Sequence, residues 1–117
     1  MIKQTLLILA LSAAPALADL ATVQNVNVTR SGASYTFNVT IRHTDVGWDD
    51  YADAWRIKDA SGNILGERAL AHPHVNEQPF TRSLSGVRIP DGVDTVIVEV
   101  HDTVNGWSEN IKTVKIP

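Results

Sequence analysis

Short segments in which apolar and polar residues strictly alternate limit most strongly what this chain can fold into. The clearest is SYTFNVTIRH, residues 34–43, in which every second residue from Tyr35 to Ile41 is apolar. Side chains two apart in an extended chain point to the same side, so this pattern is typical of a strand with one buried face. No long segment has the spacing of an amphipathic helix. The alternation therefore predicts an all-β fold.

Six further segments have the same character and are bounded by turn residues. The seven expected strands are residues 23–30, 34–43, 54–59, 64–70, 79–87, 94–102 and 109–116. Between the last two, Asn105-Gly106 predicts a tight hairpin, because this pair accepts positive φ at both central positions. Trp55 shares the inward parity of Ile57 on the third strand. Seven short strands in about 100 residues resemble an immunoglobulin-like or fibronectin type III-like antiparallel β-sandwich.

The first 18 residues, MIKQTLLILALSAAPALA, have the composition of a secretory signal. Lys3 precedes an apolar run from Leu6 to Leu11, and the segment closes with an A-x-A pattern at residues 16–18. The run is shorter than the about 20 residues of a membrane-spanning helix. We expect cleavage before Asp19, which leaves residues 19–117 as a single periplasmic or secreted domain with no membrane span.

Charge and sulfur content exclude several classes of partner. The chain has 10 Lys and Arg against 13 Asp and Glu, with no basic run, so we expect no binding to nucleic acid or anionic membranes. It has no cysteine, and Met1 is its single methionine. Thiolate and thioether copper sites are therefore disfavoured, and a metal site would use imidazole and carboxylate ligands.

All four histidines are expected at one end of the sandwich. If consecutive strands alternate in direction, the connections that follow residues 43, 70 and 102 lie together, and we call this end the loop pole. His43 ends the second strand, His72 and His74 lie in the second of these connections, and His101 lies near the end of the sixth strand.

The His72-Pro73-His74 spacing indicates a metal site. Residues two apart in an extended chain project to the same side, about 6.5–7 Å apart at the backbone. Pro73 fixes its own φ and favours an extended His72. With His43 or His101 as third and fourth ligands, the four imidazoles suit copper(II) or zinc, between which the sequence does not decide. The alternative is that these histidines are ordinary surface or hydrogen-bonded residues.

Acidic residues at the loop pole are candidates for supporting roles. Asp45 and Asp102 could hold the second imidazole nitrogen of a ligand, and Glu77 follows His74 in the same connection. His43 has a further interpretation, because its parity with Ile41 points it inward, where it could cap the core and bond Asp45 or a backbone carbonyl. His101 has outward parity, so whether it shares an ion with His43 stays open.

Aromatic residues at the same pole support a second hypothesis. Trp48, Tyr51 and Trp107 could form a binding surface for carbohydrate or protein. For Trp48 and Tyr51 we favour a plug that closes the end of the sandwich. We expect Arg82 to pair with an acidic residue of the first connection, one of Asp49, Asp50 and Asp53. A third hypothesis makes the loops a self-satisfied polar cap with a purely structural role.

Catalysis has little support in the sequence. No pair of carboxylates has a distinguishing spacing, and no serine lies in a nucleophile motif, so we predict that the protein is not an enzyme. Three segments resemble a family of small exported bacterial proteins of uncharacterised activity: HTDVGWDDYADAW (43–55), HPHVNEQPFTRSLSG (72–86) and HDTVNGW (101–107). These segments contain all four histidines. The resemblance implies export but no ligand and no reaction.

Overall fold

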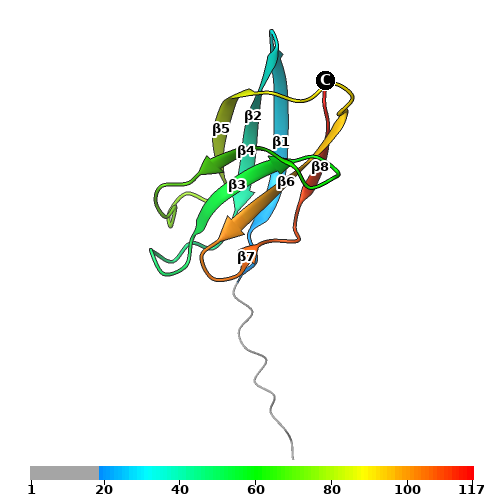
Figure 1. The fold of residues 1–117 in the computed structure, drawn as a ribbon. Helices are drawn as coiled ribbons and strands as arrows, with labels where there is room; N and C mark the ends of the chain where they lie inside the picture. Colours follow the sequence, from blue (N-terminus) through cyan, green and yellow to red (C-terminus); the bar gives the residue numbers. More distant parts are fainter. Residues whose placement is uncertain (1–18) are drawn as a thin grey trace, which may run out of the picture.

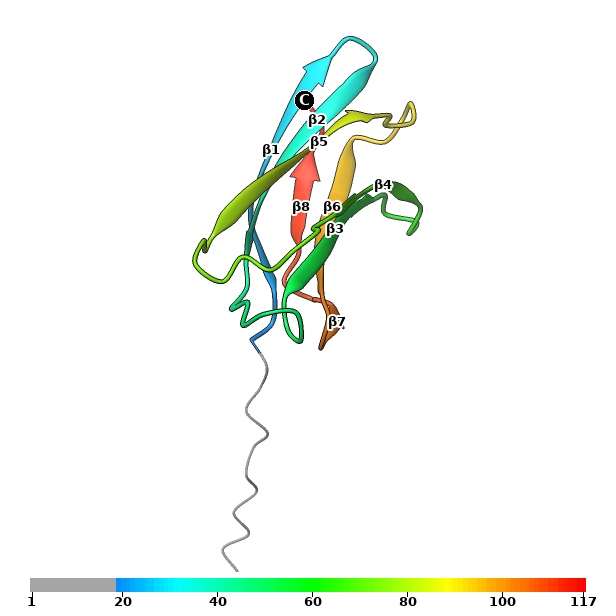
Figure 2. The same cartoon turned by 90° about the vertical axis from the view of Figure 1, so that its left-hand side faces the viewer.

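A computed structural model describes residues 19–117, and the expected signal segment, residues 1–18, lies outside the described residues. The described chain is all-β, with two antiparallel sheets (Figures 1 and 2). Its strands are β1 (Thr22–Ser31), β2 (Ser34–Arg42), β3 (Ala52–Lys58), β4 (Ile64–Ala69), β5 (Phe80–Val87), β6 (Thr95–Asp102), β7 (Gly106–Trp107) and β8 (Lys112–Lys115). Across residues 19–117, no helix has the length and apolar character needed to cross a membrane.

The two sheets contain strands that are far apart in the sequence. One sheet has the order β1-β2-β5, and the other has the order β4-β3-β6-β7, with β8 also paired to β6. The segment 70–79 passes from β4 in the second sheet to β5 in the first, and it can be followed in Figure 2 as the green chain between the two sheets. This crossing brings residues 72–78 to the ends of both sheets.

The last part of the chain forms two short strands where one was expected. Of the predicted strand 109–116, only residues 112–115 form β8, and β7 precedes it, with residues 108–111 between the two. In this break the backbone N–H of Val23 in β1 donates to the carbonyl oxygen of Asn110, at 3.0 Å. The Asn110 N–H donates to the Ser108 hydroxyl. The chain therefore leaves β6 to contact the edge strand of the other sheet, which the apolar alternation alone could not indicate.

The core follows the predicted alternation. Phe37, Val39 and Ile41 of β2 and Trp55 of β3 are at most 1% exposed. They pack with Val96, Val98 and Val100 of β6 in one apolar cluster. Burial of each large side chain contributes about 1.5–3 kcal/mol. The alternation continues past the last apolar residue of each strand. His43, two residues after Ile41, and Asp102, two residues after Val100, therefore also point inward and lie at the end of the core.

Candidate metal centre

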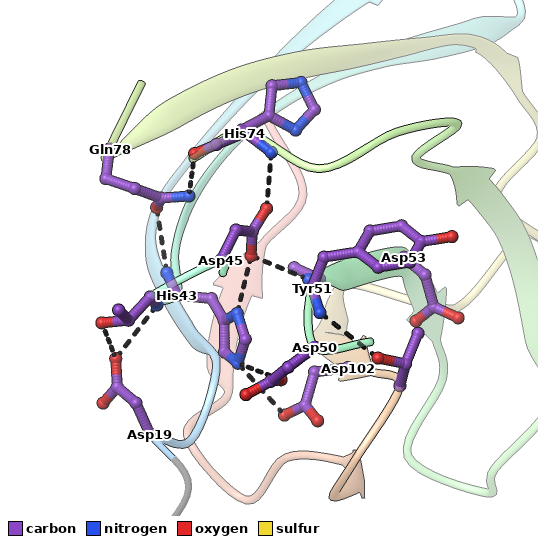
Figure 3. Close-up of polar contacts among 12 residues, drawn as sticks. Asp19, His43, Asp45, Asp50, Tyr51, Asp53, His74, Gln78 and Asp102 are labelled. Atoms are coloured by element: carbon purple, nitrogen blue, oxygen red, sulfur yellow. Dashed lines mark hydrogen bonds and ion pairs between the residues drawn. The ribbon is translucent and has the colours of Figure 1, made fainter. Parts of the chain in front are cut away.

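His43 lies at the end of the core with both ring nitrogens directed at carboxylates (Figure 3). Its side chain is fully buried, as its parity with Ile41 predicted. The ring Nδ1 lies 2.6 Å from Asp45 Oδ1, which confirms the expected bond. Because a carboxylate only accepts, Nδ1 carries a proton, and Nε2 faces the other side of the ring.

Asp45 joins three segments of the loop pole through one buried carboxylate. Its Oδ1 accepts from the His43 ring and from the backbone N–H of Ala52, at 3.0 Å. Its Oδ2 accepts from the backbone N–H of His74, at 2.7 Å. Asp45 is 3% exposed, so these bonds form away from water. The carboxylate thus fixes the His43 ring to the start of β3 and to the segment 70–79.

Asp50 reaches the other side of the His43 ring from a tight turn. The Asp50 N–H donates to the carbonyl oxygen of Gly47, and the Val46 N–H donates to the carbonyl oxygen of Asp50. Asp50 Oδ1 lies 3.4 Å from His43 Nε2 and is buried without a hydrogen-bond partner. The turn therefore presents a carboxylate oxygen to the imidazole without satisfying that oxygen.

Asp102 completes the group from the end of β6. Its Oδ1 accepts the backbone N–H groups of Val104 and Asn105, and its Oδ2 accepts from the Asn105 side chain. These bonds shape the hairpin to β7, where Gly106 has a φ of +78° and Asn105 has no positive φ. The predicted hairpin is confirmed by the pairing of β6 with β7, but the positive φ expected at Asn105 is wrong. Asp102 Oδ2 lies 3.7 Å from His43 Nε2, and the side chain is fully buried.

The three groups form a set of possible metal ligands. One atom each from His43, Asp50 and Asp102 lies within 4.8 Å of the other two. His43 Nε2 has no hydrogen-bond partner although it is buried. A protonated imidazole would form charge-assisted bonds of about 2.7–2.9 Å, shorter than the two separations from Nε2. Around a tetrahedral zinc ion with bonds of about 2.0–2.1 Å, ligand atoms lie roughly 3.3–3.4 Å apart. The observed separations are closer to this second value.

His72 and His74 lie outside this group. Their rings are neighbours, with centroids 4.6 Å apart. The His74 ring stacks on Phe80 at 3.9 Å, and its Nε2 lies 2.8 Å from Arg82 Nη2. His72 is exposed, and its Nδ1 lies 3.1 Å from the carbonyl oxygen of Pro73. The His74 backbone, rather than its ring, contacts the His43 group through Asp45.

His101 lies apart from His43, on the outer face of the five-stranded sheet. Its Nδ1 is 2.5 Å from Asp53 Oδ1, and its ring meets the edge of Trp107 at 5.0 Å between centroids. The other neighbour of Trp107 is Arg56, whose guanidinium lies 3.7 Å from the ring centroid. The alternating parity of β6 separates His101 from Asp102, so only Asp102 reaches the core side.

The aromatic residues do not form one platform. Trp48 and Tyr51 meet edge to face, with 5.6 Å between centroids and an interplanar angle of 77°. Trp48 is 67% exposed, so the prediction that it plugs the end of the sandwich is wrong. Arg82 pairs with Glu77 at 3.3 Å and contacts His74, in place of the expected acidic residue of the first connection.

Asp50 is the ligand candidate that the sequence did not single out. It lies in a loop with five acidic or aromatic neighbours, where no strand parity distinguishes one side chain from another. Asp102 was assigned a supporting role, but its parity with Val100 could have placed it beside His43. The contact between the turn 47–50 and the end of β6 depends on the tertiary fold, so nothing in the sequence pattern indicates it.

We expect His74 to make the protein less stable in mild acid. Burial and then the Arg82 guanidinium lower the pKa of His74 below its ordinary value of 6.5. The unfolded chain therefore binds more protons, and stability falls as the pH drops below about 6.5. Urea unfolding at pH 7.5 and pH 5 should show a smaller loss for His74→Gln than for the wild type. An equal loss in both proteins would contradict this assignment.

Comparison with known proteins finds one curated relative. A putative lipoprotein from Halomicrobium mukohataei is 39% identical over 92 residues, which cover 76% of this chain. The match covers 45% of the relative, so the chain spans less than half of that protein's length. No protein-family model matches the chain, and no solved structure matches it.

Proposed function

We propose that this is an exported protein that binds one divalent transition ion, zinc, through His43 Nε2, Asp50 and Asp102. The observation that carries the proposal is the buried, unpartnered His43 Nε2 between two carboxylates. With Asp45 accepting from Nδ1, Nε2 faces the two carboxylates. A positive charge at this point, either a proton on Nε2 or a bound ion, stabilises the facing carboxylates, and we propose that a zinc ion supplies it.

The surroundings of His43 match those of a metal-bound histidine. Such a ligand usually donates its other ring N–H to a carboxylate, which fixes the tautomer and the ring orientation. Asp45 does this for His43, and two backbone N–H groups hold Asp45 in turn. The His43 backbone N–H also donates to the side chain of Gln78, at 3.0 Å. The ligand is therefore preorganised before any ion arrives.

We propose zinc rather than the copper(II) that the sequence left open, because imidazole nitrogen and carboxylate oxygen are both ordinary zinc ligands. Because His43 and Asp102 are fully buried, we propose a binding role rather than catalysis.

The fold and the location form part of the same proposal. We assign the fold to the immunoglobulin-like and fibronectin type III-like sandwiches, with a buried tryptophan on the third strand. Unlike constant-type immunoglobulin domains, β4 pairs with β3 rather than joining the sheet of β1, β2 and β5. The expected signal segment and the putative lipoprotein relative both support export to the cell envelope.

A zinc titration of four proteins tests the metal centre. Each is produced from the full-length sequence, purified from the cell envelope fraction, stripped with chelator and titrated with zinc against a competing chromophoric chelator. We expect one ion per wild-type chain, with a Kd of about micromolar or tighter. His43→Ala and Asp102→Asn should each weaken binding by about 100-fold or more, because each removes a ligand.

The matched control is the double variant His72→Ala, His74→Ala, which should bind zinc as the wild type does. Loss of binding in this variant, with binding retained in His43→Ala, would move the site to the His72–His74 pair. Wild-type binding no tighter than about millimolar would reject the metal function altogether. Circular dichroism of each protein separates loss of ligand from loss of fold.

A further inference from the structure

Exposed apolar residues gather on two neighbouring loops of the loop pole. Val46 is 64% exposed, Trp48 67% and Val104 54%. The two loops are joined by backbone, because the Thr103 N–H donates to the carbonyl oxygen of Tyr51 at 3.1 Å and the Tyr51 N–H donates to the Thr103 hydroxyl. Exposed apolar residues that gather on neighbouring loops are typical of an interaction site. We call Val46, Trp48 and Val104 the apolar tip.

The apolar tip is held rigidly although it is exposed. Trp48 sits in the turn closed by the bonds between Gly47 and Asp50 and between Val46 and Asp50, at 3.2 and 3.0 Å. The edge contact with Tyr51 supports its ring. A side chain that is already ordered loses little conformational freedom on binding, so a preorganised tryptophan is a strong anchor for a partner.

The charge around the apolar tip distinguishes among partners. The segments 19–29, 43–55 and 101–110 contain no Lys or Arg, and Asp19 and Asp49 are exposed there, whereas Asp45 and Asp102 are buried. An anionic bilayer would be repelled by such a surface. A sugar would require a flat aromatic face flanked by hydrogen-bonding groups, whereas the tip combines Trp48 with two valines and a perpendicular Tyr51. A protein surface with an apolar pocket and a basic rim is complementary in both respects.

We infer that the apolar tip is the docking surface for a partner protein, with Trp48 inserted into an apolar pocket and the surrounding carboxylates facing basic residues. The apolar tip lies on the same turn as Asp50 but includes none of the three proposed zinc ligands, and its docking does not require the ion. Exposed Asp49, next to Trp48, is the carboxylate best placed to meet the basic rim.

Photo-crosslinking in the native host tests the inference. The full chain is expressed with p-benzoylphenylalanine in place of Val46 and, in a second strain, in place of Ile64, which is 48% exposed at the start of β4. Irradiation should give a protein adduct from position 46 and none from position 64. Trp48→Ala in the first strain should reduce the adduct by about ten-fold or more. Asp49→Lys should also reduce it, because the charge reversal opposes a basic rim.

The identity of the adduct, determined by mass spectrometry, gives the decisive outcome. A partner with a net positive contact surface and dependence on both Trp48 and Asp49 supports the inference. Absence of an adduct from position 46, an equal adduct from position 64, crosslinking to lipid or glycan, or insensitivity to Trp48→Ala would each overturn it. Because Trp48 and Asp49 are exposed, their substitution should leave the fold intact, and a thermal melt of each variant checks this.

Discussion

Asp45→Ala is expected to lower the free energy of unfolding by about 3–5 kcal/mol, the range for removal of one partner from a buried charged network. The substitution leaves three buried donors without an acceptor: the His43 ring, the Ala52 N–H and the His74 N–H. For a domain whose total stability is about 5–15 kcal/mol, this loss is a large fraction of the whole. Urea unfolding of the metal-free protein measures it.

Two further substitutions show whether the loss comes from these bonds. Asp49→Ala removes an exposed carboxylate from the same loop and should change stability by less than about 0.5 kcal/mol. Asp45→Asn keeps the shape of the side chain, but its amide N–H₂ cannot accept from a backbone donor, so we expect an intermediate loss. Equal stability of Asp45→Ala and Asp49→Ala would mean that water replaces all three bonds without cost.

Zinc at 100 times its Kd is expected to stabilise the native protein by about 2.7 kcal/mol, because the unfolded chain does not hold the three ligands together. For a domain of about 100 residues, this corresponds to a rise in Tm of roughly 10 °C or more. Thermal melts of the stripped protein with and without zinc measure the shift. Magnesium at the same concentration is the control, because it demands an octahedral, oxygen-rich shell.

Asp50→Asn separates a metal centre from a purely structural polar cluster. If the carboxylate served only to pair with a protonated His43, the variant would be less stable than the wild type without metal. If it is a zinc ligand, the metal-free Tm should stay close to that of the wild type or rise, since the apo site loses one of its facing negative charges. The zinc-dependent rise should then be largely lost. A variant that keeps the full zinc shift would remove Asp50 from the ligand set.

Much of the fold could be predicted from the sequence, because strand alternation is a local property. Phe37, Val39 and Ile41 reach the core as predicted, and so does Trp55. Strand alternation also correctly predicted that His43 points inward, like Ile41, and that His101 points outward. By contrast, the division of the last strand depends on a bond between Val23 and Asn110, residues 87 positions apart. No local pattern carries information about such a pair.

The candidate site divides in the same way. The His72-Pro73-His74 spacing drew attention to two rings, yet the structure directs the His74 ring towards Phe80 and Arg82. The spacing of two residues in the sequence indicates that their side chains can approach each other. It does not indicate which other residues of the fold those side chains contact instead. The guanidinium of Arg82 contacts one ring nitrogen of His74, Nε2, while Nδ1 is buried without a hydrogen-bond partner. Arg82 belongs to β5, and its contact with His74 depends on the position of β5 beside the segment 70–79.

The sequence by itself determined that this chain forms strands with one buried face, that its apolar residues meet in one core, and that His43 lies on the inner side of its strand. These properties follow from the two-residue period of the extended backbone, which any stretch of the chain carries within itself. Only the tertiary structure decided that a loop carboxylate, Asp50, reaches the His43 ring, and that Asp45 holds the other side of that ring. Loop side chains have no period to constrain them, so their partners are set by the sheets that bring separate connections together.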